Sequence, residues 1–281
     1  MKFILWLSCG LLLGPSAFNL SQPPGMGVVA QIAGALFLFF AGWEIRFINW
    51  RQDRRFYAWT FLGSFGVPFL AGYFFFEKSV FIAVALAISA LPVAVQILRE
   101  KGLYNTPLGH RAITLASVCD VCAWVIMAFL LPQENVGAWI VSHGLIFAFF
   151  VGVLAGFIRP LPESPLLSFL QKWIFVPVFF ITLGWGIDIL GLFSFEVFLK
   201  LFIASVIAKS LGTYAFSRLS GESARFSFDI SILLNARGAM EILAAHYAYR
   251  AQWIEGDVFA GLVMIGVVTS LMAVPLLRPH L

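Results

Sequence analysis

Ten apolar segments, separated by short polar loops, follow one another along this chain of 281 residues. A helix of roughly 20 apolar residues spans the hydrocarbon core of a membrane. Only 11% of the residues are charged, whereas soluble domains carry about a quarter. The sequence therefore predicts an all-α polytopic protein of about ten transmembrane helices in a lipid bilayer. The apolar segments are residues 2–18, 27–48, 57–76, 79–99, 110–131, 137–158, 170–191, 195–218, 227–249 and 256–277.

The loop charges indicate an orientation. The first segment also fits a cleaved signal peptide, but a retained helix gives the consistent topology, with both termini in the cytoplasm. One set of loops then carries only Lys78, Lys200 and Arg250, and the other set carries most of the basic residues, as cytoplasmic loops do. We expect a plasma (inner) membrane location and no nucleic-acid partner. The cytoplasmic basic residues are Lys2, Arg46, Arg51, Arg54, Arg55, Arg99, Lys101, Arg111, Arg159, Lys172, Arg218, Arg225 and Arg278.

A short motif recurs half a chain apart. Gly42-Trp43-x-Ile45 in the second segment matches Gly184-Trp185-x-Ile187 in the seventh, 142 residues later. Five helices in each repeat is an odd number, so the two repeats must lie in opposite orientations. Inverted repeats of this kind are typical of secondary transporters, whose binding site lies near the bilayer midplane.

Two helices at corresponding places in these repeats carry helix-breaking residues. Pro92 lies within the fourth segment, and Asn235 and Gly238 lie within the ninth. Opened backbone at membrane depth is tolerated only where it is buried in protein or lines a cavity. The pair of interruptions therefore predicts two crossing helices at a transport site.

Three charged residues lie at mid-depth in apolar segments. Asp120 is about ten residues into its helix, which is ~15 Å and half of the hydrocarbon thickness. Such a carboxylate is a functional candidate, the alternative being a structural Asp. We expect Asp120 to pair with Lys209. We expect Arg237 to lie at the carbonyls of the interrupted helices in a direct or structural role, paired with Glu241 one turn later.

This arrangement predicts competition between a proton and a small cation for the oxygens of Asp120. Hard cations need several oxygen ligands, and Ser89 and the opened backbone carbonyls are candidates. If the two ligands exclude each other, alternating access produces antiport without a cofactor. Glu44 and Asp229 are accessory candidates, although Glu44 also suits a local ion pair with Arg46 and Asp229 a helix cap.

The sequence does not favour disulfides, a resident metal or an enzymatic site. Cys9, Cys119 and Cys122 are odd in number and lie in apolar segments, which argues against disulfides and against a resident metal. The chain has neither an HExxH motif nor a second catalytic Asp, so we do not expect an enzyme.

Taken in order, the motifs resemble those of the monovalent cation:proton antiporters of the sodium/proton exchanger superfamily. The resemblance extends from about residue 8 to residue 278. It is carried by Gly14-Pro-Ser16, Gly42-Trp-Glu44, Ser89-Ala-Leu-Pro-Val93, Ile97-Leu98, Gly109, Cys119-Asp120, Ala208-Lys-Ser-Leu-Gly-Thr213 and Asn235-Ala-Arg-Gly-Ala-Met-Glu241.

The resemblance implies a core domain that moves against a scaffold domain, usually in a homodimer. Residues 1–56 and 132–194 would form the scaffold, and residues 57–131 and 195–281 the core. Asp120 matches the ion- and proton-binding Asp of the family, which would bind Na⁺ or K⁺ transiently. Lys209 matches the core Lys, and Ser89 matches a Ser/Thr beside the first unwound stretch.

Two departures accompany the resemblance. The residue before the essential Asp is usually Asp or Asn, whereas here it is Cys119, a poor ligand for a hard cation. One carboxylate in place of two favours one-for-one exchange. The chain is also shorter than usual for the family, with fewer scaffold helices. Two alternatives stay open: a sodium-coupled symporter in which Arg237 binds a small organic anion, and a non-transporting, degenerate antiporter-like protein.

Overall fold

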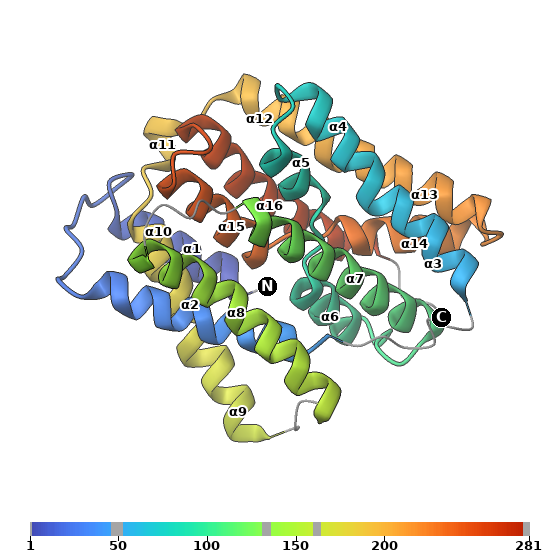
Figure 1. Cartoon of the computed structure of the whole chain (residues 1–281), viewed down its shortest axis with the longest axis horizontal. Coiled ribbons are helices and arrows are strands. Elements are labelled where there is room, and N and C mark those ends of the chain that lie inside the picture. The colour runs from blue at the N-terminus through green and yellow to red at the C-terminus, as the bar shows by residue number, and fades with distance from the viewer. Residues whose placement is uncertain (1, 46–52, 131–135, 160–163, 278–281) are drawn as a thin grey trace. The chain divides into compact units, whose positions relative to one another are not determined.

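The computed structural model describes residues 2–45, 53–130, 136–159 and 164–277, and within these ranges the chain is helical with no strand (Figure 1). The chain divides into two compact units, each drawn from both halves of the sequence. The first unit comprises Met1–Ile45 and Leu131–Phe193, and the second comprises Arg46–Leu130 and Ser194–Leu281. The scaffold and core roles that we expect of such units remain predictions.

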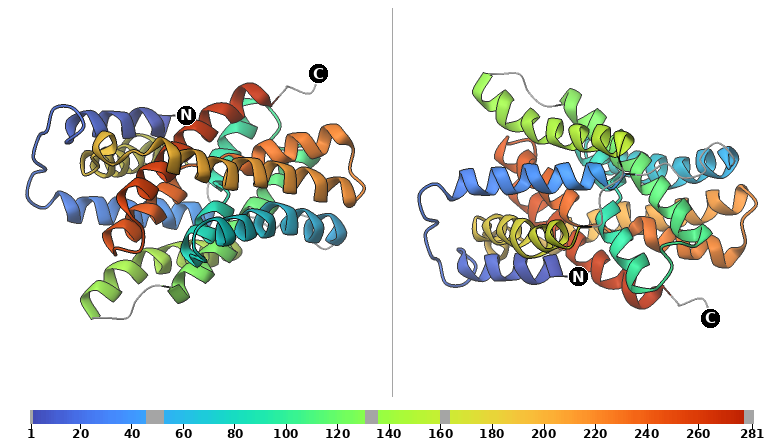
Figure 2. Two further views of the ribbon diagram at one scale, coloured as in Figure 1. Left: turned by 90° about the horizontal axis from the view of Figure 1, so that it is seen from above. Right: turned by 90° about the horizontal axis from the view of Figure 1, so that it is seen from below.

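The first unit is built from two pairs of helices. Helix α1 packs along α10, and α2 packs along α8 (Figure 2). Its helical elements are α1 (Lys2–Leu13), α2 (Met26–Trp43), α8 (Val136–Ile158), α9 (Pro165–Leu170), the π-helical turn η2 (Gln171–Phe175), α10 (Val176–Trp185) and α11 (Ile189–Leu192).

Both helix pairs of the first unit use the same glycine contact. A Cβ atom on Gly42 would lie 2.1 Å from the carbonyl oxygen of Phe149, and one on Gly184 would lie 2.5 Å from that of Leu7. Gly184 lies 142 residues after Gly42, and Leu7 lies 142 residues before Phe149. Small residues that let backbones approach are the usual basis of helix packing in membranes. The duplicated contact supports the internal repeat, while the inverted orientation of its halves remains a prediction.

The tryptophans of the repeated motif also make equivalent bonds. Trp43 Nε1 donates to the carbonyl oxygen of Arg159 at 2.8 Å, just past the end of α8. Trp185 Nε1 donates to the carbonyl oxygen of Leu20 at 2.7 Å, in the loop after α1. Each motif therefore ties the end of its own helix to the chain that follows its partner helix.

The second unit contains the predicted ionisable site residues, apart from Glu44. In it α13 packs against α3, η1 and α14, and α7 packs against α3, α5 and α14. Its helical elements are α3 (Arg54–Phe61), η1 (Leu62–Gly66), α4 (Val67–Phe75), α5 (Val80–Ala87), α6 (Leu91–Glu100), α7 (Pro107–Leu130), α12 (Phe195–Phe202), η3 (Ile203–Ile207), α13 (Ala208–Leu219), α14 (Ala224–Asn235), α15 (Ala239–Arg250) and α16 (Gly256–Leu276).

The two predicted interruptions are confirmed. Non-helical backbone at 88–90 separates α5 from α6, and Pro92 occupies the first turn of α6, where no intrahelical donor is lost. Residues 236–238 separate α14 from α15 in the same way. The two openings cross, because Ala90 N–H donates to the carbonyl oxygen of Ala236 at 3.1 Å.

Three π-helical turns were not predicted. Two of them, η1 and η2, directly precede helices with a proline at their second position, Pro68 in α4 and Pro177 in α10. A proline ring clashes with the carbonyl of the preceding turn, and widening that turn relieves the clash. The third turn, η3, has no such proline and ends at Ile207, two residues before Lys209.

Helices lie within each of the ten apolar segments, although their ends differ: α1 ends at Leu13 and α2 at Trp43. Within the described residues, five helical stretches are long and apolar enough to cross a membrane. These features fit a polytopic helical membrane protein, and the full number of ten crossings stays a prediction. The five stretches are Met26–Trp43, Arg54–Phe75, Val80–Glu100, Pro107–Leu130 and Gly256–Ala273.

Candidate functional site

Asp120 lies in the middle of α7 and is completely buried. Its Oδ2 accepts a hydrogen bond of 3.3 Å from the backbone N–H of Leu91, the first residue of α6. Its Oδ1 has no hydrogen-bond partner among the described residues. The carboxylate thus lies against the positive end of a half-helix and keeps one oxygen available for a ligand.

Lys209 enters the same helix break from α13 and is also completely buried. Its Nζ donates to the carbonyl oxygens of Ala87 at 2.6 Å and Ile88 at 2.8 Å, and to Ser89 Oγ at 2.8 Å. An ammonium group has three N–H donors, so this cage of three oxygens satisfies all of them. We call these three oxygens the lysine cage.

The expected direct ion pair between Asp120 and Lys209 is wrong. The ion pairs within 4.0 Å in the described part of the chain do not include it. The reason is the opened backbone, which presents carbonyl oxygens to the ammonium on one side and an N–H to the carboxylate on the other. Ser89 and its neighbours therefore lie between the two charges and link them.

The expected position of Arg237 is confirmed. The guanidinium is completely buried and donates to the carbonyl oxygens of Ala85, at 3.0 Å, and Leu86, at the end of α5. It also forms the expected ion pair with Glu241, at 2.7 Å, and both side chains are inaccessible to solvent. Two cations, Lys209 and Arg237, therefore bind the carbonyl end of one half-helix.

The second helix break is held by neutral side chains as well. Asn235 Nδ2 donates to the carbonyl oxygen of Val206 at 3.2 Å and to Ser210 Oγ at 2.8 Å. Ser270 Oγ on α16 donates to the carbonyl oxygen of Arg237. The Ser270 bond satisfies a carbonyl that the opened backbone exposes, and the Asn235 bonds tie the end of α14 to η3 and α13.

Cys119 is buried beside the candidate carboxylate, but its Sγ meets Ser64 Oγ at 3.6 Å. No group of three or more His, Cys, Asp or Glu side chains suited to a metal ion occurs within the described ranges. A transported cation would therefore rely on one carboxylate, Asp120, with Ser89 and backbone carbonyls. Ser64 did not feature in the sequence prediction, since an isolated serine in an apolar helix carries no distinctive signal.

The accessory candidates lie elsewhere. Glu44 caps the C-terminal end of α2 in the first unit, and its expected partner Arg46 is outside the described residues. Asp229 is buried in the middle of α14 and does not cap that helix, because Ser223 accepts the capping bond from Phe226 N–H. The lysine cage is formed by oxygens of Ala87, Ile88 and Ser89, so neither accessory candidate contributes to it.

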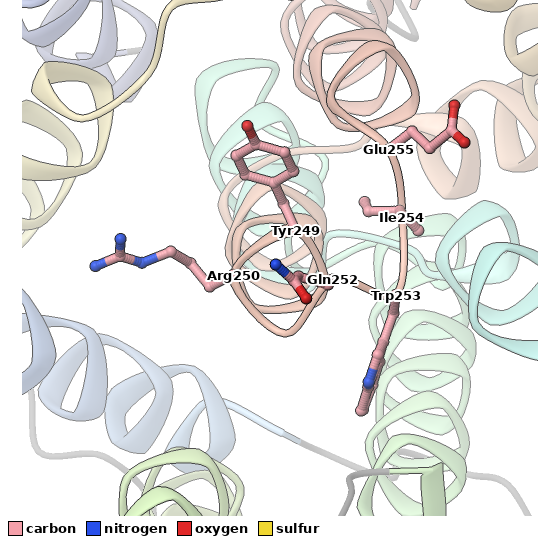
Figure 3. A pocket seen from close by; sticks show the side chains of 6 residues that line it. All are labelled: Tyr249, Arg250, Gln252, Trp253, Ile254 and Glu255. Carbon is pink, nitrogen blue, oxygen red and sulfur yellow. The ribbon is translucent and has the colours of Figure 1, made fainter.

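A surface hollow of about 630 Å³ lies at the turn between α15 and α16 (Figure 3). Arg250 and Glu255 extend to opposite sides of it, and Tyr249 stacks on Phe259. None of its lining side chains is a predicted site residue, so the hollow is not part of the candidate site.

The transmembrane family described as sodium/hydrogen exchanger matches the chain in two stretches, residues 2–164 and 143–281, which together cover nearly all of it. The chain belongs to this family. The crossing breaks and the buried Asp120 and Lys209 are therefore features of a sodium/hydrogen exchanger family member, an integral multi-pass membrane protein.

Relatives of this exchanger family member carry consistent names. It is 24% identical over 361 residues to the Na(+)/H(+) antiporter NhaS4 of Synechocystis, with 95% of this chain and 88% of the relative covered. It is 23% identical to the Na(+)/H(+)-K(+) antiporter GerN of Bacillus cereus, with 97% and 88% covered. It is 22% identical to Cation/H(+) antiporter 19 of Arabidopsis thaliana, with 95% and 45% covered.

These matches differ in how much of each relative they cover. The chain spans 45% of the length of the plant relative. The alignment to the Synechocystis protein extends over 361 residues, more than the 281 of this chain, so it passes over segments present only in the relative. The expectation of a shortened member is confirmed.

Proposed function

We propose that the protein is a secondary active transporter that exchanges a monovalent cation, Na⁺ or K⁺, for H⁺. The names of the bacterial relatives support this exchange. The observation that carries the proposal is the fully buried Asp120, whose free Oδ1 lies beside two crossing helix breaks. A proton or a cation can neutralise this carboxylate, but a single free oxygen cannot serve both at once.

The lysine cage supplies the remaining cation ligands. Three oxygens already surround one positive charge, the ammonium of Lys209, at 2.6 to 2.8 Å. Carbonyl and hydroxyl oxygens that replace a hydration shell are what a dehydrated monovalent cation requires. A cation that binds Asp120 Oδ1 would draw on Ser89 Oγ and displace the ammonium from it. Lys209 thus holds the site in a charge-compensated state until the cation arrives.

The charge count favours one-for-one exchange. Asp120 is the carboxylate at the crossing, while Glu241 is already paired with Arg237. Replacing one proton by one monovalent cation leaves the net charge of the site unchanged. Cys119, whose Sγ lies 3.6 Å from Ser64 Oγ, adds no second carboxylate.

The wider architecture follows from the same proposal. Ten transmembrane helices in two inverted repeats would form a core, the second unit, that moves against a scaffold, the first unit, in alternating access. Both termini would lie in the cytoplasm, in a plasma (inner) membrane. Two chains would associate through their scaffolds as a homodimer.

The symporter alternative is disfavoured by the contacts of Arg237. Arg237 would have to bind the carboxylate of an organic anion, yet its guanidinium is already bonded to Glu241 and to two carbonyl oxygens. Releasing it would leave Glu241 buried and unpaired, which is costly.

Purified protein in liposomes with an acidic lumen tests the exchange. A luminal pH dye should report alkalinisation when Na⁺ or K⁺ is added outside, and Asp120→Asn should abolish this response. The matched control is Asp257→Asn, since Asp257 lies in the first turn of α16 and, among the described residues, its carboxylate accepts from its neighbour Val258 N–H alone. No response of the wild-type protein to Na⁺, K⁺ or Li⁺, with the fold intact, would overturn the proposal.

A further inference from the structure

Lys209 is the second residue after the π-helical turn η3, at the place where the other two such turns are followed by a proline. The second residue of the next helix is Pro68 after η1 and Pro177 after η2. After η3 it is Lys209. A proline at position 209 would favour the wide turn, but it would also remove the ammonium from the lysine cage. The turn η3 therefore needs another group to stabilise it.

The wide turn determines the direction in which Lys209 points. In η3 the N–H of Ala208 donates to the carbonyl oxygen of Ile203, five residues earlier, whereas an α-helix uses the residue four earlier. The turn thus adds one residue to the helix, and one residue corresponds to ~100° of rotation about the helix axis. Without the turn, Lys209 would be rotated by this angle relative to α12. With it, the Nζ atom reaches the lysine cage.

Asn235, the last residue of α14, bonds this turn from the side. Its Nδ2 donates to the carbonyl oxygen of Val206, within η3, at 3.2 Å and to Ser210 Oγ at 2.8 Å. An amide nitrogen has two N–H donors, so both are used. In a continuous α-helix the carbonyl of Val206 accepts from the N–H of Ser210. A side chain that bonds this carbonyl competes with the α-helical bond and favours the wider turn.

The crossing of the two helix breaks sets the position of Asn235. The next residue, Ala236, accepts the hydrogen bond from Ala90 N–H that joins the breaks. The Asn235 side chain is only 8% exposed. The contacts form a closed loop, which leads from the first break through Ala236 and Asn235 to η3 and returns through Lys209 to residues 87–89.

We propose that Asn235 is a positioning residue, which stabilises η3 and thereby directs the ammonium of Lys209 into the lysine cage. Its consequence for transport rests on the proposed exchange, in which the ammonium and the transported cation compete for Ser89 Oγ. When Lys209 points elsewhere, the cage oxygens are left to the cation, which then binds more tightly and leaves more slowly. Asn235 therefore sets the balance between cation binding and cation release.

The variant Asn235→Leu tests this role, because it removes both donors at nearly constant volume. Calorimetry on the detergent-purified protein measures its affinity for Na⁺ or K⁺, and liposomes measure its exchange rate. The first measurement does not require transport. The matched control is Ser231→Ala, one turn earlier on α14, where the buried hydroxyl donates at 2.7 Å to the carbonyl oxygen of Phe228 in its own helix.

We expect Asn235→Leu to bind the cation roughly tenfold more tightly, the equivalent of one hydrogen bond lost by the competing ammonium. The maximal exchange rate should fall, because release of a tightly bound cation limits turnover. Ser231→Ala should bind the cation as the wild type does. In a Lys209→Ala background, Asn235→Leu should change the affinity no further, since Asn235 acts through Lys209.

A deletion tests the rotation itself. Ile207 is the last residue of η3 and its side chain is 43% exposed, so its removal takes out the residue that the wide turn adds without opening the interior. Asn235→Leu combined with this deletion should restore the wild-type position of Lys209 and the wild-type affinity. If Asn235→Leu alone does not fold, the combined variant provides the test, because the proposal requires that it folds.

Unchanged cation affinity in Asn235→Leu would overturn the positioning role. The same change in affinity with and without Lys209 would also overturn it, as would a combined variant that does not fold or does not recover the wild-type affinity. Affinities that change as expected, in a wild-type protein that exchanges no cation for protons, would instead overturn the proposed function and support the positioning role.

Discussion

The backbone N–H of Ala90 donates a hydrogen bond of 3.1 Å to the carbonyl oxygen of Ala236 and so joins the two helix breaks of the second unit. Charges around this junction match the half-helix ends. Lys209 and Arg237 bind carbonyl oxygens at the end of α5, and Asp120 accepts from the first N–H of α6. The C-terminal end of a helix carries a partial negative charge and the N-terminal end a partial positive charge. The junction therefore holds two cations and one anion with little direct pairing between them.

The lysine cage should bind an external cation once its ammonium is removed. In Lys209→Ala the oxygens of Ala87, Ile88 and Ser89 lose their donor, and ammonium or K⁺ should raise the melting temperature of the variant in a saturable manner. N-methylglucamine, which is too large for the cage, serves as the control cation. Identical cation dependence of the variant and wild type would contradict a cation-sized cage.

Breaking the buried Arg237–Glu241 pair should be strongly destabilising. Either Arg237→Met or Glu241→Gln leaves its partner without a buried ion pair, which costs about 3–5 kcal/mol. Glu196→Gln is the matched control, since the Lys200–Glu196 pair has the same spacing but is solvent-exposed and should not change the melting temperature measurably. Thermal unfolding in detergent measures both, and equal effects would show that burial of the pair is unimportant.

Glycine at position 63 should be required by packing, whereas glycine at 66 should not. Gly63→Ala would place a methyl group 2.3 Å from the carbonyl oxygen of Gly212, and overpacking of this kind costs about 1–3 kcal/mol. Gly66→Ala meets nothing within 4 Å and should be neutral or slightly stabilising. Unfolding of the two variants in the same detergent compares them, and similar stabilities would argue against close contact of η1 and α13.

The tryptophans of the repeated motif, Trp43 and Trp185, should contribute equally to the stability of the protein. Trp43→Phe and Trp185→Phe each remove one Nε1 donor, to Arg159 and Leu20 respectively, at a cost of about 0.5–1.5 kcal/mol. A Trp173→Phe variant controls for the general loss of indole, since Trp173 is not part of the repeated motif. Thermal unfolding with clearly unequal losses for the first two variants would weaken the proposed internal repeat.

The sequence predicted features that have a local chemical signal. Pro92 and the Asn235–Gly238 stretch break helices by themselves, and the structure opens at both. The pairing of Arg237 with Glu241 followed from their one-turn spacing. The family resemblance could likewise be recognised in the sequence, because its motifs keep a fixed order along the chain.

The remaining features depend on partners that a single sequence does not place. Asp120 and Lys209 were expected to pair because both are charged, but the opened backbone between them binds each one separately. The buried hydroxyls of Ser205 and Thr213 were overlooked, since serine and threonine are common in membrane helices. Their meaning depends on which neighbouring helices they face.

The central claim, that a proton and a cation compete for Asp120, can be measured by calorimetry on the detergent-purified protein. Titration with Na⁺ or K⁺ in buffers of different ionisation enthalpy gives the number of protons released for each cation bound. The account predicts a value close to one at a pH where the site is protonated, and no cation binding in Asp120→Asn. Cation binding without proton release, or undiminished binding in that variant, would contradict it.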